Sequence, residues 1–516
     1  LKFCVFYIII YLIFYFSGVY DIMFKEGFDN NKYISLQTAR INERISKFGG
    51  KLYLEFGGKL FDDFHASRVL PGFKPDSKIN MLLHLKDKAE VVVVVSATAI
   101  EQNKIRADLG ITYDMDTLRL IDAFRDKGVY VGSVCITHYS GQPKADAFIS
   151  KLSSLGIRVF KHYPIEGYPT NVKLIVSDDG YGKNEYIETT RQLVVVTAPG
   201  PGSGKMATCL SQLYHDNKRG IKSGYAKFET FPVWNLPPNH PVNIAYEAAT
   251  ADLADVNMID PFHLEAYGET TVNYNRDIEI FPVLRSLFEA IYGECPYKSP
   301  TDMGVNMVGF CIYDDEAVSA AARDEIIRRY YSSLLKNRKG LCGSDEVYKV
   351  ELIMKRAKLS IDDRHVVRAA LDKSAATDAP AAAIELSDGH IVTGKTSDLL
   401  GSCAAAILNA LKYLAGIDDS VHLISPSILE PICKLKTDNL GCSNPRLHAD
   451  EILIALSICA TSGENAKKAM AHIEGLKKCE AHSSVIVSHV DSNTFRKLGI
   501  NFTCEPVYET KKLFHI

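Results

Sequence analysis

Five consecutive valines, residues 91–95, constrain the fold of this chain more than any other sequence feature. A strand with apolar side chains on both faces needs cover on both sides, which helices on the two faces of a parallel sheet provide. Residues 193–197 form a second run of this kind, and residues 114–127 between them carry apolar side chains at helical spacing. Strand patterns also occur at residues 129–136 and 157–160. This β-α-β alternation predicts a mainly parallel sheet with ligands bound beyond the carboxyl ends of its strands.

The length of 516 residues is too great for one ordinary core and predicts several domains. Residues 314–373 are rich in Ala, Arg, Glu and Leu without a strong strand pattern, which indicates helices. A second α/β pattern follows, with strands at 383–386, 390–394, 421–425 and 485–490 and helices at 397–414 and 446–461. We predict a multi-domain α/β protein with a Rossmann-like or P-loop-like three-layer N-terminal part, a helical middle and a smaller C-terminal α/β subdomain. The predicted boundaries are 23–313, 314–380 and 381–516.

An apolar run at residues 3–16 precedes this pattern. The run is shorter than the roughly 20 residues that span a bilayer, and Met23 opens a polar, helix-compatible segment. We expect residues 1–22 to be upstream sequence or a short apolar leader, with a membrane anchor and a secretory signal as alternatives. The twelve cysteines lack the spacing of zinc knuckles or redox dithiols, and we expect reduced, mostly buried thiols rather than a disulfide framework. We therefore expect a cytoplasmic protein with no membrane partner.

A glycine-rich loop joins the strand at 193–197 to a helical pattern and carries the best functional signal. Gly200, Gly202 and Gly204 lack side chains, so backbone N–H groups can approach a phosphate closely. The N-terminus of the following helix adds roughly half a positive charge, and Lys205 would add a full one. The sequence therefore predicts a site for a phosphate group, with a purely structural turn and a solvated lysine as the alternative.

The loop has the context of a phosphate-binding loop but not the residues of the Walker A pattern. Pro199 stands where the first glycine of that pattern would fall, and Met206 replaces the hydroxyl residue that holds Mg²⁺. Ser203 and Thr208 are the substitutes that the sequence offers for that hydroxyl group. The usual coordination of Mg²⁺ is therefore in doubt.

Further charged residues follow glycine turns or strand patterns. Lys59 and Lys183 each follow a glycine and could add charge at the same sheet edge, although surface lysines are common in such turns. Asp178 and Asp179 follow a predicted strand at 172–176, where a carboxylate could hold a metal ion through water. A plain Asp-Asp-Gly turn is the alternative that we favour for this pair.

Two short segments combine histidine with charged residues. His65 and Arg68 lie in a segment where the arginine could bind a phosphate or carboxylate group, with a solvated loop as the alternative. Asp260, His263 and Glu265 lie within six residues, and the last two would share a face if the segment were extended. This segment could bind a metal ion or take part in acid–base catalysis, and the alternative is a structural loop held by hydrogen bonds.

Several long segments closely resemble a family of bacterial and protist proteins of about five hundred residues that are catalogued as hypothetical or of unknown function. The segments are KLYLEFGGKLFDDFHASRVLPGFKPDSK, HYPIEGYPTNV, VVVTAPGPGSGKMATCLSQLYH, YAKFETFPVWNLP and NMIDPFHLEAYG. The resemblance covers nearly everything from Met23 onward and implies an architecture with N-terminal and C-terminal parts. It implies no activity, and it places residues 1–22 outside the family pattern.

These observations lead to one main functional hypothesis. We expect a small phosphorylated ligand, such as ATP or another nucleotide with Mg²⁺, bound by the glycine loop in a phosphotransferase or ATP-dependent ligase. The alternatives are a non-catalytic metabolite sensor and a metal-dependent hydrolase centred on His263 and Glu265. A formal net charge of −3 gives no overall attraction to nucleic acid, and self-association into a homo-oligomer is compatible with the sequence.

Overall fold

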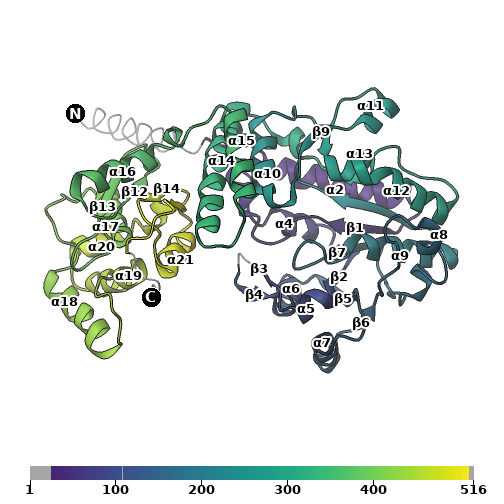
Figure 1. Cartoon of the computed structure of the whole chain (residues 1–516), viewed down its shortest axis with the longest axis horizontal. Coiled ribbons are helices and arrows are strands. Elements are labelled where there is room, and N and C mark those ends of the chain that lie inside the picture. The colour runs from purple at the N-terminus through teal and green to yellow at the C-terminus, as the bar shows by residue number, and fades with distance from the viewer. Residues whose placement is uncertain (1–24, 107–108, 511–516) are drawn as a thin grey trace, which may run out of the picture. The chain divides into compact units, whose positions relative to one another are not determined.

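A computed structural model describes residues 25–106 and 109–510 and divides them into two compact units (Figure 1). One unit comprises Glu26–Ala321, and the other is built mainly from the residues after it. The apolar run at residues 3–16 lies outside the described residues. Within them, no helix is both long and apolar enough to cross a membrane.

The first unit is built on a parallel sheet of seven strands in the order β11-β8-β1-β7-β2-β5-β6. The strands are β1 (Leu52–Phe56), β2 (Ala89–Ser96), β5 (Tyr130–Thr137), β6 (Val159–Lys161), β7 (Leu193–Thr197), β8 (Gly224–Phe228) and β11 (Gly304–Val305). All eight residues of β2 are buried, as the valine run predicts. The predicted parallel sheet is therefore confirmed.

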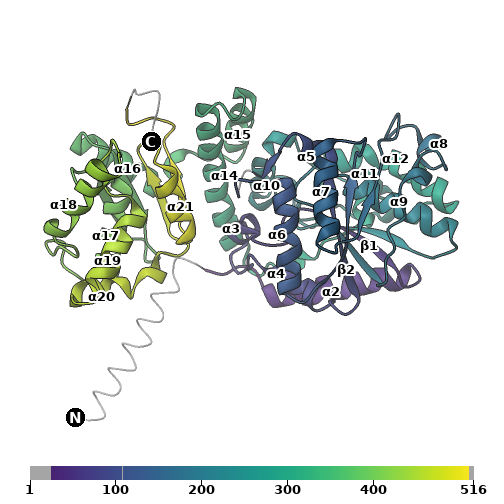
Figure 2. The same cartoon turned by 90° about the horizontal axis from the view of Figure 1, so that it is seen from below.

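Helices cover both faces of this sheet and complete three layers. Figure 2 has α6 (Tyr113–Asp126) and α7 (Pro143–Ser154) on one side of β1 and β2, and α9 (Lys205–Lys218) and α12 (Asn275–Tyr292) on the other. Strand residues alternate between the two layers, because successive side chains of a strand point to opposite faces. Val94 and Val196, for example, pack in one cluster with Leu210 of α9 and Phe281 of α12. The expected three-layer α/β architecture is present.

The strand order places a topological switch point beside β7. The chain forms β1, β2, β5 and β6 before β7 enters the sheet between β1 and β2. From β7 the chain crosses to β8 on one side, whereas from β2 it crosses to β5 on the other side. Open α/β sheets bind ligands in the crevice at the carboxyl ends of strands where the crossovers diverge in this way.

Shorter elements complete the first unit. The remaining helices are α2 (Asn30–Lys47), α3 (Phe64–Val69), α4 (Ser77–Leu83), α5 (Ala97–Glu101), α8 (Val172–Ile175), α10 (Pro241–Ala249), α11 (Pro261–Tyr267) and α13 (Pro300–Met303). Two small antiparallel pairs join β3 (Ile105–Arg106) to β4 (Ile111–Thr112), and β9 (Asn257–Ile259) to β10 (Val272–Tyr274). Helix α2 thus falls in the polar, helix-compatible segment that Met23 opens.

The middle of the chain is helical, as its composition predicts. Its helices are α14 (Asp315–Arg338), α15 (Ser344–Arg356) and α16 (His365–Thr377). The boundary between the two compact units falls within α14, after Ala321.

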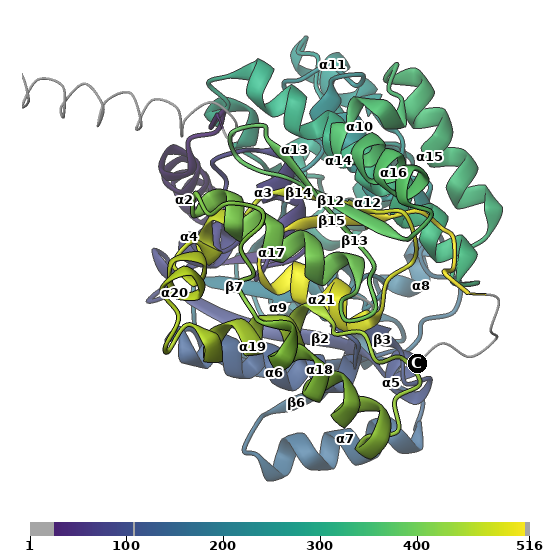
Figure 3. The same ribbon diagram turned by 90° about the vertical axis from the view of Figure 1, so that its left-hand side faces the viewer.

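The second unit contains a mixed sheet in the order β13-β12-β14-β15, shown in Figure 3. Its strands are β12 (Ala381–Glu385), β13 (Ile391–Lys395), β14 (Glu480–Ser483) and β15 (Asn501–Cys504), and its further helices are α17 (Ser402–Leu414), α18 (Pro426–Lys434), α19 (Ala449–Cys459), α20 (Glu464–Met470) and α21 (His489–Lys497). Ala383 packs against α16, whereas its neighbours Ala382 and Ile384 face the larger core formed with α17. The smaller C-terminal α/β part is therefore also present.

Three predicted strands are wrong for local reasons. Residues 172–176 form the helical turn α8, because the Asn171 side chain accepts a hydrogen bond from the Leu174 amide and caps it. Residues 485–490 leave the sheet and enter α21, which Ser488 caps in the same way. Residues 421–425 connect α17 to α18 without pairing to a described strand. Short apolar runs do not separate strands from helical turns, since capping side chains can decide between them.

Candidate functional site

The glycine loop links β7 directly to α9, and this confirms the strand, loop and helix order predicted for it. The loop residue Gly202 and the helix N-cap Gly204 both have left-handed backbone conformations, with φ values of 73° and 84°. No side chain in the described part of the chain caps the helix. Because the first N–H groups of a helix have no partner within it, those of α9 remain available to an acceptor.

Hydrogen bonds and close packing with neighbouring residues hold the loop in place. The Thr137 hydroxyl group at the end of β5 donates a hydrogen bond of 2.7 Å to the Ser203 carbonyl oxygen. The Ser203 hydroxyl group in turn donates to the Gly200 carbonyl oxygen at 2.8 Å. A Cβ atom at position 200 would lie only 2.2 Å from the Tyr113 hydroxyl oxygen. Gly200 is therefore required by close packing against Tyr113.

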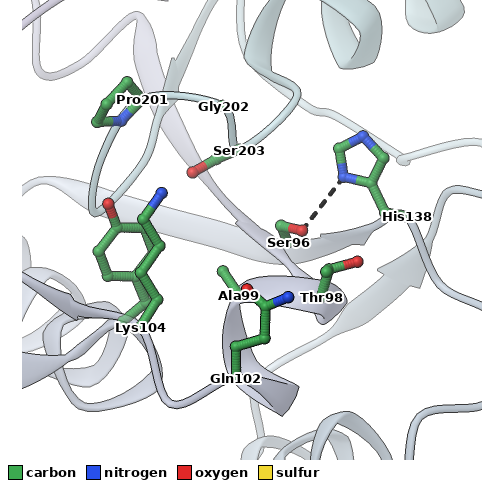
Figure 4. Close-up of a pocket in the computed structure, with 10 residues that line it drawn as sticks. Ser96, Thr98, Ala99, Gln102, Lys104, His138, Pro201, Gly202 and Ser203 are labelled. Atoms are coloured by element: carbon green, nitrogen blue, oxygen red, sulfur yellow. Dashed lines mark hydrogen bonds between the residues drawn. The ribbon is translucent and has the colours of Figure 1, made fainter. Parts of the chain in front are cut away.

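An open pocket of about 310 Å³ lies against this loop. Its lining residues are Ser96, Thr98, Ala99, Gln102, Lys104, Tyr113, His138, Pro201, Gly202 and Ser203 (Figure 4). They come from the segments that follow β2, β5 and β7, at the carboxyl edge of the sheet. The pocket therefore occupies the switch point that the strand order defines.

His138 stands at the end of β5 and faces this pocket. Its backbone has a φ of 51°, which is uncommon for a residue with a side chain and marks local strain. Its Nδ1 atom lies 3.2 Å from the Ser96 hydroxyl oxygen, the interaction drawn in Figure 4. Burial lowers the pKa of His138 below its ordinary value. The imidazole is therefore uncharged at neutral pH and can accept or donate one hydrogen bond in the pocket.

Lys104 supplies the positive charge that lines the pocket. Figure 4 shows its side chain extending toward the loop at Ser203. Its Nζ atom lies 5.3 Å from the centre of the Tyr113 ring. Sequence analysis missed both Lys104 and His138, because only the strand order brings their segments beside the loop.

The predicted loop residues Lys205 and Thr208 do not line the pocket. Lys205 is half-buried as the first residue of α9. Burial raises the pKa of the Cys209 thiol well above its ordinary value, Glu55 raises it further and Lys205 lowers it, so both charges act near Cys209. Thr208 is fully buried, with its hydroxyl oxygen 4.0 Å from the Cys135 sulfur. The role predicted for Lys205 in phosphate binding stays a prediction.

Asp178, Asp179 and Lys183 cluster away from the glycine loop. Asp178 accepts a hydrogen bond of 2.6 Å from Tyr214 and pairs with Lys218 at 3.1 Å. Lys218 ends α9, which places it about 20 Å along the helix axis from the loop. Lys183 Nζ lies 3.5 Å from a carboxylate oxygen of Asp179, and both side chains are largely exposed. The premise that this acidic pair ends a strand is wrong, since a helical turn precedes it.

Lys59, His65 and Arg68 follow β1 and also lie outside the pocket lining. Lys59 is exposed, and Arg68 is half-buried in the last turn of α3. The His65 ring packs edge-on against Phe231 and Tyr246, with ring centres 5.4 and 5.5 Å apart. The structure thus gives His65 aromatic neighbours.

Asp260 and His263 belong to the start of α11. The Asp260 carboxylate is fully buried and accepts hydrogen bonds from the Phe262 and His263 amides and from the amide and hydroxyl groups of Thr301. His263 Nδ1 lies 2.8 Å from the Ser299 hydroxyl oxygen, and Glu265 is exposed. The expectation that His263 and Glu265 share an extended face is wrong, because successive helical residues turn by about 100°.

A buried charge cluster that sequence analysis missed lies at the carboxyl ends of β1 and β8. Lys227 Nζ pairs with Asp277 and lies 3.0 Å from a Glu229 carboxylate oxygen. Glu229 also accepts a hydrogen bond of 3.2 Å from the Trp234 indole, and Tyr225 donates to Glu55 at 2.7 Å. Burial raises the pKa of Glu229 to about 7. The alternation of charged and apolar residues in the segment YAKFET could have indicated this buried charge cluster.

The predicted metal ligands Asp178 and Asp179 pair with lysines, and Asp260 accepts its hydrogen bonds from amide and hydroxyl groups. In the part of the chain that the structure describes, no three His, Cys, Asp or Glu side chains are grouped to hold a metal ion.

Comparison with known sequences covers nearly the whole chain. Residues 26–358 match the family model described as Domain of unknown function DUF1846, N-terminal, and residues 362–514 match its C-terminal counterpart. A UPF0371 protein of Streptococcus thermophilus is 58% identical over 492 residues, which cover 95% of this chain and 100% of the relative. A UPF0371 protein of Streptococcus pyogenes serotype M1 is 58% identical over 488 residues, which cover 95% and 99% of the two chains. The similarity therefore extends through both units.

Proposed function

The chain belongs to the family described as Domain of unknown function DUF1846, and from its site geometry we propose that it binds a small phosphorylated ligand. The phosphate group lies on the glycine loop, in the pocket at the carboxyl ends of β7, β2 and β5. The ligand is an anion because the described lining of the site offers backbone amides and the ammonium group of Lys104, but no carboxylate.

One observation carries this proposal: α9, which no side chain of residues 25–106 or 109–510 caps, begins two residues after Ser203 in the lining of a pocket at the switch point of the sheet. Aligned peptide dipoles give a helix N-terminus roughly half a positive charge, and free N–H groups there bind phosphate oxygens. Lys104 on the facing wall and Lys205 at the first position of the helix add positive charge. The strained, uncharged His138 adds a hydrogen-bonding group that could exchange a proton with the ligand.

A phosphate-binding site of this kind can belong to an enzyme or to a protein that only binds its ligand. ATP or another nucleotide with Mg²⁺ is one ligand of this class, and phosphoryl transfer or ligation is one reaction that begins with it. A metabolite sensor would bind the same ligand without changing it. Incubation with the ligand, followed by analysis of products, separates the enzyme from the sensor.

Thermal unfolding in the presence of inorganic phosphate, phosphorylated metabolites and nucleotides, with and without Mg²⁺, tests the binding step. A ligand at 100 times its Kd stabilises the folded protein by about 2.7 kcal/mol. Gly202→Glu places a carboxylate at an exposed loop position and should abolish the stabilisation; because a side chain is strained at a φ of 73°, the shift is measured against the variant's own unfolding without ligand. Lys205→Ala should weaken it.

Lys183→Ala is the matched control, because Lys183 is an exposed lysine away from the loop. This variant should keep the full stabilisation by ligand. If no phosphate compound stabilises the wild-type protein, or if Gly202→Glu and wild type respond equally, the proposed site is wrong.

A further inference from the structure

The walls of the pocket outside the glycine loop are formed mainly by polar side chains. Thr98 and Gln102 are exposed at the pocket, and no hydrogen bond of their side chains to another described residue is present. Ser96 is paired with His138, whose other ring nitrogen has no partner within residues 25–106 and 109–510. These groups offer a hydroxyl group, an amide and an imidazole nitrogen to a ligand.

The pocket offers little to a nucleobase. Bases bind to proteins largely by stacking on aromatic rings, and drug-sized ligands generally need an apolar wall. Tyr113 is the single aromatic ring, apart from the His138 imidazole, among the described lining residues. The Tyr113 hydroxyl group is in close contact with Gly200, and Lys104 Nζ lies near its ring. The aromatic surface of Tyr113 is thus already occupied.

The volume and the charge of the pocket also favour a small phosphorylated ligand without a nucleobase. The volume of about 310 Å³ falls at the low end of the 300–1,000 Å³ range of ligand pockets. A phosphate monoester carries roughly −1.5 to −2 charges at neutral pH, which matches the helix N-terminus together with Lys104. A ligand that fills the remaining space must satisfy polar groups, since unpaired polar groups in a closed complex weaken binding.

We propose that the ligand is a phosphate monoester of a small polyhydroxylated compound, such as a sugar phosphate. This inference rests on the proposed function and specifies its ligand class. The phosphate group lies between the N-terminus of α9 and Lys104, and the hydroxyl groups of the ligand face Thr98, Gln102 and His138. A neutral imidazole accepts a hydrogen bond from one ligand hydroxyl group, which orients that group relative to the phosphate.

Isothermal titration with five probes tests the ligand class on the full chain. The probes are inorganic phosphate, glycerol 3-phosphate, glucose 6-phosphate, AMP and ATP. Glucose 6-phosphate should bind at least tenfold more tightly than inorganic phosphate and AMP. Gln102→Ala should weaken binding of glucose 6-phosphate about fivefold and leave binding of inorganic phosphate unchanged, because the amide contacts only the polyol.

Lys104→Met should weaken the binding of inorganic phosphate and glucose 6-phosphate alike, whereas Lys151→Met, at an exposed position of α7, should change neither. Tighter binding of AMP or ATP than of glucose 6-phosphate would overturn the ligand class, and so would an equal loss for phosphate and sugar phosphate in Gln102→Ala. Either result leaves the proposed function standing. If none of the five probes binds, both proposals fail.

Discussion

The Thr137 hydroxyl group donates a hydrogen bond of 2.7 Å to the Ser203 carbonyl oxygen. Thr137 ends β5 and Ser203 follows β7, so this bond passes over the end of β2, the strand between them. The same residue precedes the strained His138. One buried threonine therefore fixes the glycine loop relative to the histidine across the pocket.

Replacing Thr137 with valine should weaken both the fold and the site. The change keeps the shape of the side chain but leaves the buried Ser203 carbonyl oxygen without this donor, which costs about 1–3 kcal/mol of unfolding free energy. Urea unfolding measures the loss, and titration with inorganic phosphate measures the weaker binding. Thr117→Val is the control, since Thr117 donates to the Tyr113 carbonyl oxygen within α6. If both variants bind phosphate equally well, Thr137 does not position the loop.

Gly200→Ala should destabilise the protein through a single contact. The new Cβ atom would lie 2.2 Å from the Tyr113 hydroxyl oxygen, well below the closest approach of real atoms. Overpacking of this kind costs about 1–3 kcal/mol, measurable by urea unfolding. Gly132→Ala in β5 is the control, because its Cβ atom would meet its nearest neighbour at an ordinary 3.6 Å. An equally small loss in both variants would contradict the described packing of Gly200.

Glu229→Gln should change how stability depends on pH. The folded-state pKa of Glu229, about 7, lies above its ordinary value of 4.5 because the carboxyl group is buried. Its protonation therefore stabilises the wild type fully below about pH 4.5, and this stabilisation is lost as the pH rises through 7. The difference amounts to on the order of 3 kcal/mol. Between pH 4.5 and pH 8, urea unfolding should show that the wild type loses more free energy of unfolding than the variant. Equal losses in the two proteins would refute the raised pKa of Glu229.

His162→Gln should act in the opposite direction. Complete burial lowers the pKa of His162 from 6.5 to about 4, and its Nε2 atom lies 3.2 Å from the Glu185 carbonyl oxygen. Stability from the neutral ring is present above about pH 6.5 and is lost as the pH falls through 4, because the unfolded chain takes up the proton first. Between pH 7 and pH 4 the wild type should lose about 3 kcal/mol more than the glutamine variant in urea unfolding. Equal losses would mean that the ring is not buried in this way.

Asp491→Asn should lower the pKa of His448 in the second unit. The Asp491 carboxylate lies 2.9 Å from His448 Nδ1, and this hydrogen bond is the main cause of the raised pKa of the histidine. Without the charge, burial remains and favours the neutral ring. Titration of the His448 ring protons by NMR measures the change. A pKa that is the same in both proteins would show that Asp491 does not hold the proton on His448.

The glycine loop could be predicted because its signal is local. A buried strand, three glycines and an amphipathic helix follow one another within residues 193–214, so the order of strand, loop and helix is predicted from this segment alone. The valine run similarly requires a strand covered on both faces. The short run at 172–176 was predicted wrongly, since the cap provided by Asn171 outweighed its apolar character.

His138 and Lys104 could not be found in the same way. They lie 60 or more residues before the loop in the sequence, and they meet it only because β7 enters the sheet between β1 and β2. Nothing in the local pattern of β7 determines which strands become its neighbours. The buried charged residues in and directly after β8 could have been found from the sequence, because Lys227 and Glu229 interrupt an apolar strand pattern. Asp277, a carboxylate partner of Lys227, comes from α12, much later in the chain.

The late position of β7 in the sequence also determines when this sheet can be completed during synthesis on the ribosome. β2 ends at residue 96 and β7 ends at residue 197, so about 100 residues must be added before the gap between β1 and β2 is filled. At 5–20 residues per second, that interval lasts roughly 5–20 s. During it, the edges of β1 and β2 that later pair with β7 have no native partner, and unpaired strand edges of this kind are prone to aggregation.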